Sequence, residues 1–202
     1  MHSKNPHQKE FFNKQSKEWD EITSHDPEKL EFIVKLLSLQ QGQTVLDVGT
    51  GTGVMIPYLY SYVQRKGKIV AVDYSKKMIE LSKRKYPPQE YPNVKFLIKD
   101  IIALSMLNEY DSILCYSCFP HFSDKVETVK HLVKGLKKGG KLMIAHSESR
   151  DAINNLHKDT LEVSADFLPT MREIAKMMES SGLKVIVKID NDEMFIIIAK
   201  HQ

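Results

Sequence analysis

The chain has 202 residues, 42% of them hydrophobic, and a formal net charge of +3. This length and composition predict one compact domain with a substantial core, and the lysines are too dispersed to indicate a nucleic-acid partner. No uncharged apolar run approaches membrane-spanning length, and the first ten residues are polar, so neither a spanning helix nor a signal sequence is expected. The two cysteines, Cys115 and Cys118, predict no disulfide framework and favour a reducing, cytoplasmic location.

The first 27 residues are polar except for four apolar side chains at roughly helical spacing. These are Phe11, Phe12, Trp19 and Ile22. The pattern predicts an amphipathic helix whose aromatic side chains either pack on the core or cover a ligand. A second helix is expected from Asp26-Pro27 to Gln41-Gly42, because proline is tolerated in a first helical turn and glycine commonly ends a helix.

Residues 44–53, TVLDVGTGTG, predict a short buried strand that runs into a glycine-dense turn and then a helix. Glycines at alternate positions let the backbone turn sharply and approach a ligand closely. The unpaired N–H groups at the start of the following helix would face that ligand. A turn without a ligand is the weaker alternative, because three glycines weaken a strand and a helix unless a close approach requires them.

Two further predicted strands also end in acids. Lys68–Asp73 is expected to be the second strand, and Asp73 lies 20 residues beyond Gly53. An acid at this position can accept hydrogen bonds from ribose hydroxyls, although a helix N-cap is the simpler alternative and Ser75 could fill that role. The third strand is expected over residues 94–100, where Asp100 binds a ligand or is an ordinary turn aspartate.

The glycine turn departs from the dinucleotide pattern G-x-G-x-x-G, because Val54 stands where the last glycine is required. Its D-x-G-x-G-x-G pattern resembles motif I of class I S-adenosylmethionine-dependent methyltransferases that act on small molecules. The resemblance covers residues 44–200 and includes the run L-K-K-G-G-x-L before the fifth strand. It implies S-adenosylmethionine as cofactor and a set of residues that contact it. These are Asp47, Gly49, Gly51 and Gly53 at the methionine moiety, Asp73 at the ribose, Tyr74, Met78, Asp100 and Ile101 or Ile102 at the adenine, and Cys115 at the end of the fourth strand.

The loop after the fourth strand, Tyr110–Tyr116, is expected to face the transferred group, because ligands of open α/β sheets bind beyond the carboxyl ends of strands. His121 is the first candidate for a general base and Tyr116 the second. Phe119 of this loop and Trp19 of the N-terminal helix are expected to contact the acceptor. Cys115, Cys118 and His121 could also be metal ligands, but a fourth ligand is not evident and buried cysteines are more often apolar core residues, so no metal is predicted.

The segment from His146 to Pro169 is expected to build the acceptor pocket. His146 ends the fifth strand, and a helix over residues 150–157 would present Arg150, Asn154 and His157 on one face. These groups could bind an anionic acceptor. The alternatives are a solvated polar helix, or a metal held by His121, His146 and His157.

The chain is expected to end with a helix over residues 169–179 and a hairpin of two strands, residues 183–189 and 193–200. We therefore predict an α/β fold, a Rossmann-like class I methyltransferase with a mostly parallel seven-stranded sheet and a C-terminal antiparallel hairpin. Residues 1–42 would be a helical lid segment and residues 43–202 the S-adenosylmethionine-binding domain, together forming a single domain.

The predicted activity is transfer of a methyl group from S-adenosylmethionine to a small-molecule acceptor. The alternatives are a nucleotide-dependent oxidoreductase and a protein that binds S-adenosylmethionine without turnover. Nucleic acid is a disfavoured partner, because the chain lacks the N/D-P-P-Y/F tetrad expected of adenine N-methylation. No membrane partner is expected, and the sequence makes no prediction of oligomeric state.

Overall fold

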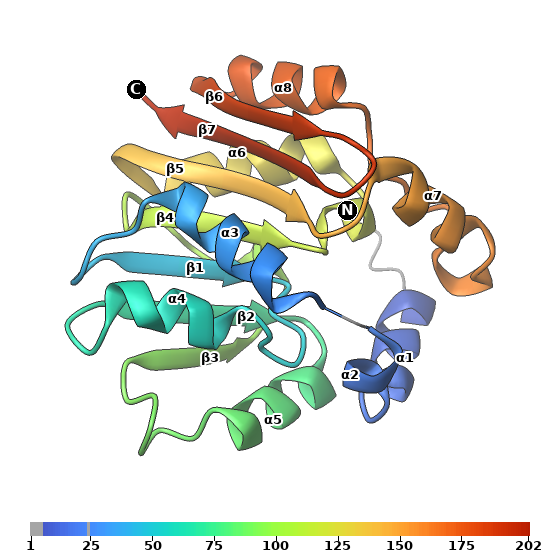
Figure 1. The fold of residues 1–202 in the computed structure, drawn as a ribbon, viewed down its shortest axis with the longest axis horizontal. Coiled ribbons are helices and arrows are strands. Elements are labelled where there is room, and N and C mark those ends of the chain that lie inside the picture. Colours follow the sequence, from blue (N-terminus) through green and yellow to red (C-terminus); the bar gives the residue numbers. More distant parts are fainter. Residues whose placement is uncertain (1–5, 24) are drawn as a thin grey trace.

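The computed structural model describes residues 6–23 and 25–202. Its centre is a seven-stranded sheet in the order β3-β2-β1-β4-β5-β7-β6 (Figure 1). The strands are β1 (Thr44–Val48), β2 (Lys68–Asp73), β3 (Val94–Ile98), β4 (Tyr110–Tyr116), β5 (Leu136–His146), β6 (Leu183–Asp190) and β7 (Phe195–His201). The strands β1 to β5 pair in parallel, whereas β7 is antiparallel to both β5 and β6. The predicted mostly parallel sheet with a terminal antiparallel hairpin is confirmed.

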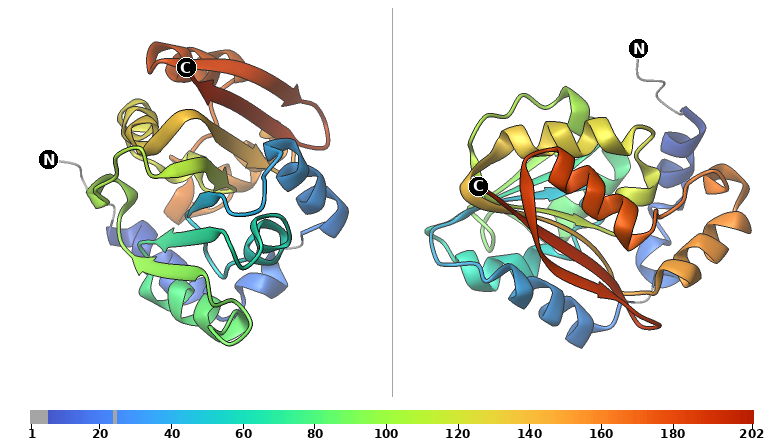
Figure 2. Two further views of the ribbon diagram at one scale, coloured as in Figure 1. Left: turned by 90° about the vertical axis from the view of Figure 1, so that its left-hand side faces the viewer. Right: turned by 90° about the horizontal axis from the view of Figure 1, so that it is seen from above.

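Helices pack on both faces of this sheet (Figure 2). The α-helices are α1 (Pro6–Gln15), α2 (Trp19–Ile22), α3 (Pro27–Leu37), α4 (Ile56–Val63), α5 (Lys76–Lys85), α6 (Lys125–Gly135), α7 (Arg150–Lys158) and α8 (Met171–Ser180). Helices α3 and α4 share one core cluster with the sheet, and α6 and α8 share the cluster on the opposite face. Helices α1, α2 and α7 lie beyond the carboxyl ends of the parallel strands (Figure 1).

The strands β1, β2, β4 and β7 are apolar almost throughout because both faces of the sheet are covered there, whereas the edge strands β3 and β6 are partly exposed. In β1, Val45 belongs to the cluster beneath α3 and α4, whereas Leu46 and Val48 belong to the other. In β7, Ile196 and Ile198 face the first cluster, whereas Phe195, Ile197 and Ala199 face the second. This two-sided burial fixes the register, since a slip of one residue would exchange every side chain between the two cores.

The N-terminal helices differ from the prediction. The single amphipathic helix expected over residues 1–27 is wrong, because α1 ends at Gln15 and the short α2 follows at Trp19. The hydroxyl of Ser16 donates to the carbonyl of Asn13, a local bond that competes with continuation of the helix. Residues 1–5 of that prediction lie outside the described residues.

Other boundaries also move. Strand β5 begins at Leu136, so the run L-K-K-G-G-x-L lies inside this strand rather than before it. Helix α3 ends at Leu37 rather than near Gly42, because Ser38 adopts a left-handed conformation with φ of 53°. Strand β3 ends at Ile98, and Asp100 instead caps a short 3-10 helix, Ile101–Ala103. Helix α8 begins at Met171, because Thr170 and Glu173 form a reciprocal capping box there.

Among the described residues, no helix combines the length and the apolar character needed to cross a membrane.

Candidate functional site

The loop after β1 contains three glycines with positive φ, namely 64° at Gly49, 55° at Gly51 and 89° at Gly53. A Cβ on Gly49 would lie 2.6 Å from Cβ of Cys118, and one on Gly53 would lie 2.3 Å from Oγ of Ser82. A Cβ on Gly51 would meet nothing closer than 4.0 Å. Gly49 therefore lets the loop pack against the loop after β4, Gly53 lets it pack against α5, and Gly51 presents its backbone to open space.

Two buried carboxylates support this loop. Oδ2 of Asp73 accepts a hydrogen bond from the N–H of Gly51 at 3.0 Å, and its Oδ1 accepts one from the N–H of Ser75 at 2.7 Å. The hydroxyl of Thr50 donates to Oδ2 of Asp47 at 2.5 Å. Burial raises the pKa of Asp47 to about 7 and that of Asp73 to about 6. A ligand that donates hydrogen bonds or carries positive charge here would stabilise the ionised carboxylates.

A cavity of about 1140 Å³ opens beside the loop, at the carboxyl ends of the strands where the strand order reverses between β1 and β4. Its volume exceeds the roughly 300–1,000 Å³ typical of a site for one small ligand. One end is lined by Gly49, Gly51 and Asp73. The predicted adenine-side residues Tyr74, Met78, Asp100, Ile101 and Ile102 all line the same cavity.

The N-terminal helices cover this cavity. The ring of Phe12 lies 5.4 Å from Trp19 and 6.3 Å from Tyr74, centroid to centroid. Asp20 accepts a hydrogen bond at 2.6 Å from the hydroxyl of Thr52 in the glycine loop. It also forms an ion pair with Lys85, at 2.7 Å. These contacts tie α1 and α2 to the loop after β1 and to α5.

The other end of the cavity is lined by Asp166 and three histidines, His121, His146 and His157. Nδ1 of His121 lies 2.8 Å from Oδ2 of Asp166, and Nδ1 of His157 lies 2.8 Å from the carbonyl oxygen of Asp166. The rings of His121 and His157 are 5.0 Å apart. His146 is buried, and its Nε2 has no hydrogen-bond partner among the described residues. Burial lowers the pKa of His146 to about 3 and also lowers that of His157, so both imidazoles are neutral at pH 7.

Tyr116 lines the cavity between these two ends. Its hydroxyl lies 2.9 Å from Nδ1 of His25 and 2.8 Å from Oγ of Ser147. Burial raises the pKa of Tyr116, and the hydrogen bond with Ser147 only partly opposes this. The phenol is therefore protonated and bonded on both sides.

Besides Arg150 and Asn154 of α7, four predicted site residues do not line the cavity, namely Asp47, Gly53, Cys115 and Phe119. Cys115 is fully buried in β4, and Phe119 is fully buried against Phe122, whose ring is 5.8 Å away. Phe122 rather than Phe119 faces the cavity, because the short 3-10 helix Phe119–His121 turns the first side chain into the core.

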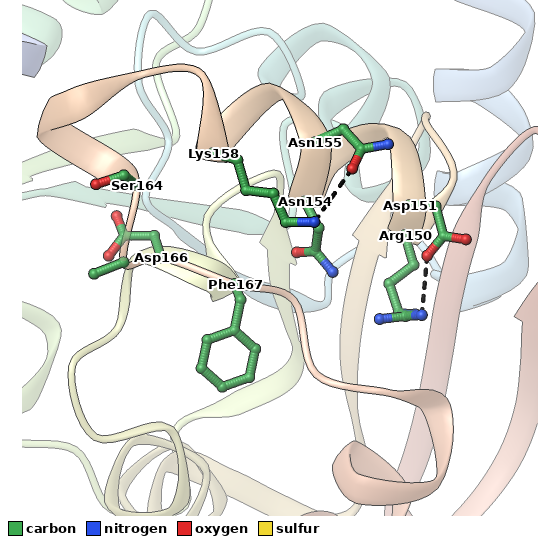
Figure 3. A pocket seen from close by; sticks show the side chains of 9 residues that line it. Arg150, Asp151, Asn154, Asn155, Lys158, Ser164, Asp166 and Phe167 are labelled. Atoms are coloured by element: carbon green, nitrogen blue, oxygen red, sulfur yellow. Dashed lines mark hydrogen bonds and ion pairs between the residues drawn. The ribbon is translucent and has the colours of Figure 1, made fainter.

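The three polar groups predicted on α7 do not converge on one site. Arg150 and Asn154 line a second pocket of about 320 Å³ (Figure 3), whereas His157 lines the main cavity. In that pocket Arg150 pairs with Asp151 at 2.9 Å. The side chain of Asn154 instead bonds the backbone N–H and carbonyl of Leu168, which closes the loop after α7.

Asp166 and His25 are two cavity residues that sequence reasoning missed. Each lies in a loop with no motif, and Asp166 meets His121 across 45 residues of chain. The metal alternatives also find no support, since no cluster of three or more His, Cys, Asp or Glu side chains in residues 6–23 and 25–202 could hold a metal ion.

The strand order, the terminal hairpin and the glycine loop beside a buried acid define a Rossmann-like α/β fold of the methyltransferase type. The family model described as a methyltransferase domain matches residues 39–201, and the chain belongs to this family.

Named relatives share this domain. The malonyl-(acyl-carrier protein) O-methyltransferase of Priestia megaterium is 31% identical over 140 residues, which are 68% of this chain and 50% of that protein. The demethylmenaquinone methyltransferase of Bacillus cereus is 24% identical over 175 residues, 75% of this chain and 74% of that protein. The chain spans about half the length of the first curated relatives it matches.

Solved structures share the fold over nearly the whole chain. A SAM-dependent methyltransferase from Aquifex aeolicus superimposes with a TM-score of 0.74 at 24% identity, covering 94% of this chain and 98% of the other. Phosphoethanolamine N-methyltransferase 2 of Haemonchus contortus, solved in complex with S-adenosyl-L-methionine, gives a TM-score of 0.73 at 15% identity, covering 87% and 52%.

Proposed function

We propose that this chain is an S-adenosylmethionine-dependent methyltransferase that acts on a small-molecule acceptor. The observation that carries the proposal is the buried carboxylate of Asp73, fixed by Gly51 and Ser75 at one end of a 1140 Å³ cavity. This volume leaves room for an acceptor beside a nucleoside cofactor. Membership of the methyltransferase family supports the same conclusion.

The residues around Asp73 fit the parts of S-adenosylmethionine. Asp73 would accept hydrogen bonds from the ribose, and the open backbone of Gly49 and Gly51 would hold the methionine moiety. Tyr74, Met78, Asp100 and Ile101 would border the adenine. Asp47, Gly53 and Cys115 would act indirectly, by shaping the loop and the strand beneath it, because they do not line the cavity.

When bound, this cofactor supplies a methyl group on a sulfonium. The protein then has to orient the acceptor for in-line attack and exclude water. Trp19, His146 and His157 are proposed to contact the acceptor. His121 is the favoured general base, because the hydroxyl of Tyr116 is already bonded to His25 and Ser147 and is better suited to positioning.

Helices α1 and α2 are the proposed lid. Their contacts with the glycine loop and α5 would close the cofactor end once the ligands are bound. Helix α3 is not included, because its apolar face belongs to the core beneath the sheet.

We further propose a cytoplasmic location without a nucleic-acid or membrane partner. The two free, buried cysteines, Cys115 and Cys118, are compatible with a reducing compartment.

Calorimetric titration with S-adenosylhomocysteine at pH 8 tests the cofactor assignment. Asp73→Asn should weaken binding by about 10- to 100-fold, because hydrogen bonds to a charged group contribute roughly 1.5–3 kcal/mol. The exposed Asp192→Asn is the control. Binding of NAD instead of S-adenosylhomocysteine would support the oxidoreductase alternative. Tight binding without methyl transfer to any fraction of a metabolite extract would support a non-catalytic binding protein.

A further inference from the structure

The contact between His121 and Asp166 joins two segments that are far apart in the chain. Asp166 lies in the loop before α8, and Nδ1 of His121 meets its Oδ2 at 2.8 Å. Both side chains are largely buried, with relative exposures of 17% for His121 and 16% for Asp166. The amide of Gln8 in α1 donates to the same carboxylate oxygen at 2.6 Å.

This contact determines which ring nitrogen of His121 carries the proton. Burial opposes ionisation of Asp166, but the hydrogen bonds from His121 and Gln8 outweigh it and hold the pKa of the carboxyl below its usual value. An ionised carboxylate only accepts hydrogen bonds, so Nδ1 of His121 is the donor. Nε2 then keeps its lone pair on the side of the ring away from Asp166, and His121 lines the cavity.

The ring is also held in place from its sides. Phe12 packs against His121 with centroids 5.0 Å apart and an interplanar angle of 74°. His157 lies 5.0 Å away on a tilted plane. A base that is fixed in tautomer and orientation is effective because its lone pair is already aligned with the proton it removes.

We propose that Asp166 is a positioning residue that holds His121 as a general base acting through Nε2, and that the acceptor is a hydroxyl compound, methylated on oxygen. The inference rests on the proposed function and names the substrate class of the same site. The acceptor oxygen forms the new bond to the methyl carbon, and the carbon–sulfur bond breaks with its electron pair moving to sulfur. The hydroxyl proton passes to Nε2 of His121, whose positive charge Asp166 stabilises, and leaves from there to water.

The charged groups that contact this cluster are already bonded, which favours a neutral hydroxyl over a carboxylate or an ammonium. A carboxylate would need no base and would need a cation, yet Nζ of Lys125 is bonded to the carbonyls of Pro120 and Phe122 at 2.9 and 3.0 Å. The other lysines that line the cavity, Lys9 and Lys99, make no hydrogen bond to His121, His157 or Asp166. An ammonium would need an anion, yet the carboxylate of Asp166 is bonded to His121 and Gln8, and the other carboxylates of the cavity make no hydrogen bond to this cluster.

His146 lines the same end of the cavity as a neutral imidazole. Its Nε2 is itself buried and makes no hydrogen bond to any described residue, and leaving such a group unsatisfied costs about 1–3 kcal/mol. Because burial keeps this imidazole neutral, His146 adds no charge that would attract an ionised acceptor.

The first test reads the tautomer directly. Long-range ¹H–¹⁵N NMR of histidine-labelled protein saturated with S-adenosylhomocysteine should show His121, assigned with His121→Gln, protonated at Nδ1 and unprotonated at Nε2. In Asp166→Asn the amide can donate to Nδ1, so the proton should move to Nε2. The exposed Asp159→Asn in the same segment should leave the wild-type pattern unchanged. Protonation of Nε2 in the wild-type protein would overturn the proposal.

The second test measures transfer from labelled S-adenosylmethionine to defined probes: catechol and 4-nitrophenol, the carboxylates hexanoate and phenylacetate, and phenethylamine. Transfer should favour the phenols, and kcat should fall about 10²- to 10⁴-fold in Asp166→Asn with little change in KM. Transfer confined to carboxylates or amine, no transfer to either phenol, or an unchanged kcat in Asp166→Asn would each contradict the proposal. Failure of the wild-type protein to bind S-adenosylhomocysteine would instead refute the proposed function itself.

Discussion

The three glycines after β1 have different roles at the scale of single residues. At Gly49 and Gly53 an added Cβ would overlap a neighbouring atom, Cβ of Cys118 and Oγ of Ser82 respectively. At Gly51 a side chain is disfavoured only by the positive φ of the backbone. Both Gly49 and Gly51 line the cavity, but a Cβ would meet open space only at Gly51. The spacing D-x-G-x-G-x-G therefore combines packing against the loop after β4 and against α5 with access for the cofactor.

Gly49→Ala should lower the free energy of unfolding by about 2–5 kcal/mol. A left-handed alanine costs about 1–2 kcal/mol, and the overlap with Cys118 adds about 1–3 kcal/mol. Gly42→Ala is the matched control, because Gly42 also has positive φ, 89°, but no atom lies within 4 Å of its added Cβ. Gly42→Ala should lower the free energy of unfolding only by the cost of a left-handed alanine, about 1–2 kcal/mol. Urea denaturation of both variants measures the difference, and equal losses would show that the contact with Cys118 has no effect.

Helices α1 and α2, the proposed lid, are the feature to consider at the scale of elements. Helix α1 is bonded to the rest of the protein through Gln8 and Asn13, and α2 is bonded through Asp20, which accepts from Thr52 and Lys85. Asp20 and Lys85 are substantially exposed, with side-chain exposures of 51% and 36%. Exposed pairs of this kind contribute only about 0–1 kcal/mol, which suits an element that has to open for ligand exchange.

Asp20→Asn should therefore weaken binding of S-adenosylhomocysteine by no more than about fivefold, mainly through faster dissociation. The fluorescence of Trp19 should report dissociation of the ligand, because Trp19 is the sole tryptophan in the sequence and lines the cavity. Stopped-flow fluorescence would measure the dissociation rate, with the neighbouring exposed Glu21→Gln as control. An unchanged rate in Asp20→Asn would mean that the contacts of Asp20 do not hold the lid closed.

The elements also show why sequence predicts some features and not others. The central strands were predictable because β-branched and apolar runs covered on both faces leave a local signal, and the edge strand β6 was predictable because apolar and polar residues alternate along it. Asp73 was predictable from its spacing after the glycine turn. Asp166 was not, because its role depends on a contact with His121 that no local pattern encodes. The break between α1 and α2 and the inward turn of Phe119 likewise depend on individual hydrogen bonds and packing contacts rather than on periodicity.

At the scale of the whole molecule, the carboxyl edge of the sheet carries groups whose ionisation opposes folding in different pH ranges. Burial raises the pKa of Asp47 to about 7 and that of Asp73 to about 6. The stability that these neutral acids contribute is fully present below their ordinary pKa of 3.8 and is lost as pH rises through 6 and 7. His146 acts in the opposite direction, because its pKa of about 3 makes the protein more stable as pH rises from 3 to 6.5.

These opposing effects partly cancel in the pH dependence of the wild-type free energy of unfolding. The contribution of one acid is therefore best measured as the difference between a variant and the wild type. Asp47→Asn keeps an oxygen that can accept from Thr50 but cannot ionise. Its free energy of unfolding relative to wild type should therefore increase from pH 4 to pH 8, by about 1.4 kcal/mol for each unit of the Asp47 pKa shift. Urea denaturation at several pH values measures this slope. The exposed Asp192→Asn should give a difference independent of pH, and the same flat result for Asp47→Asn would mean that Asp47 is ionised in the folded protein at pH 4.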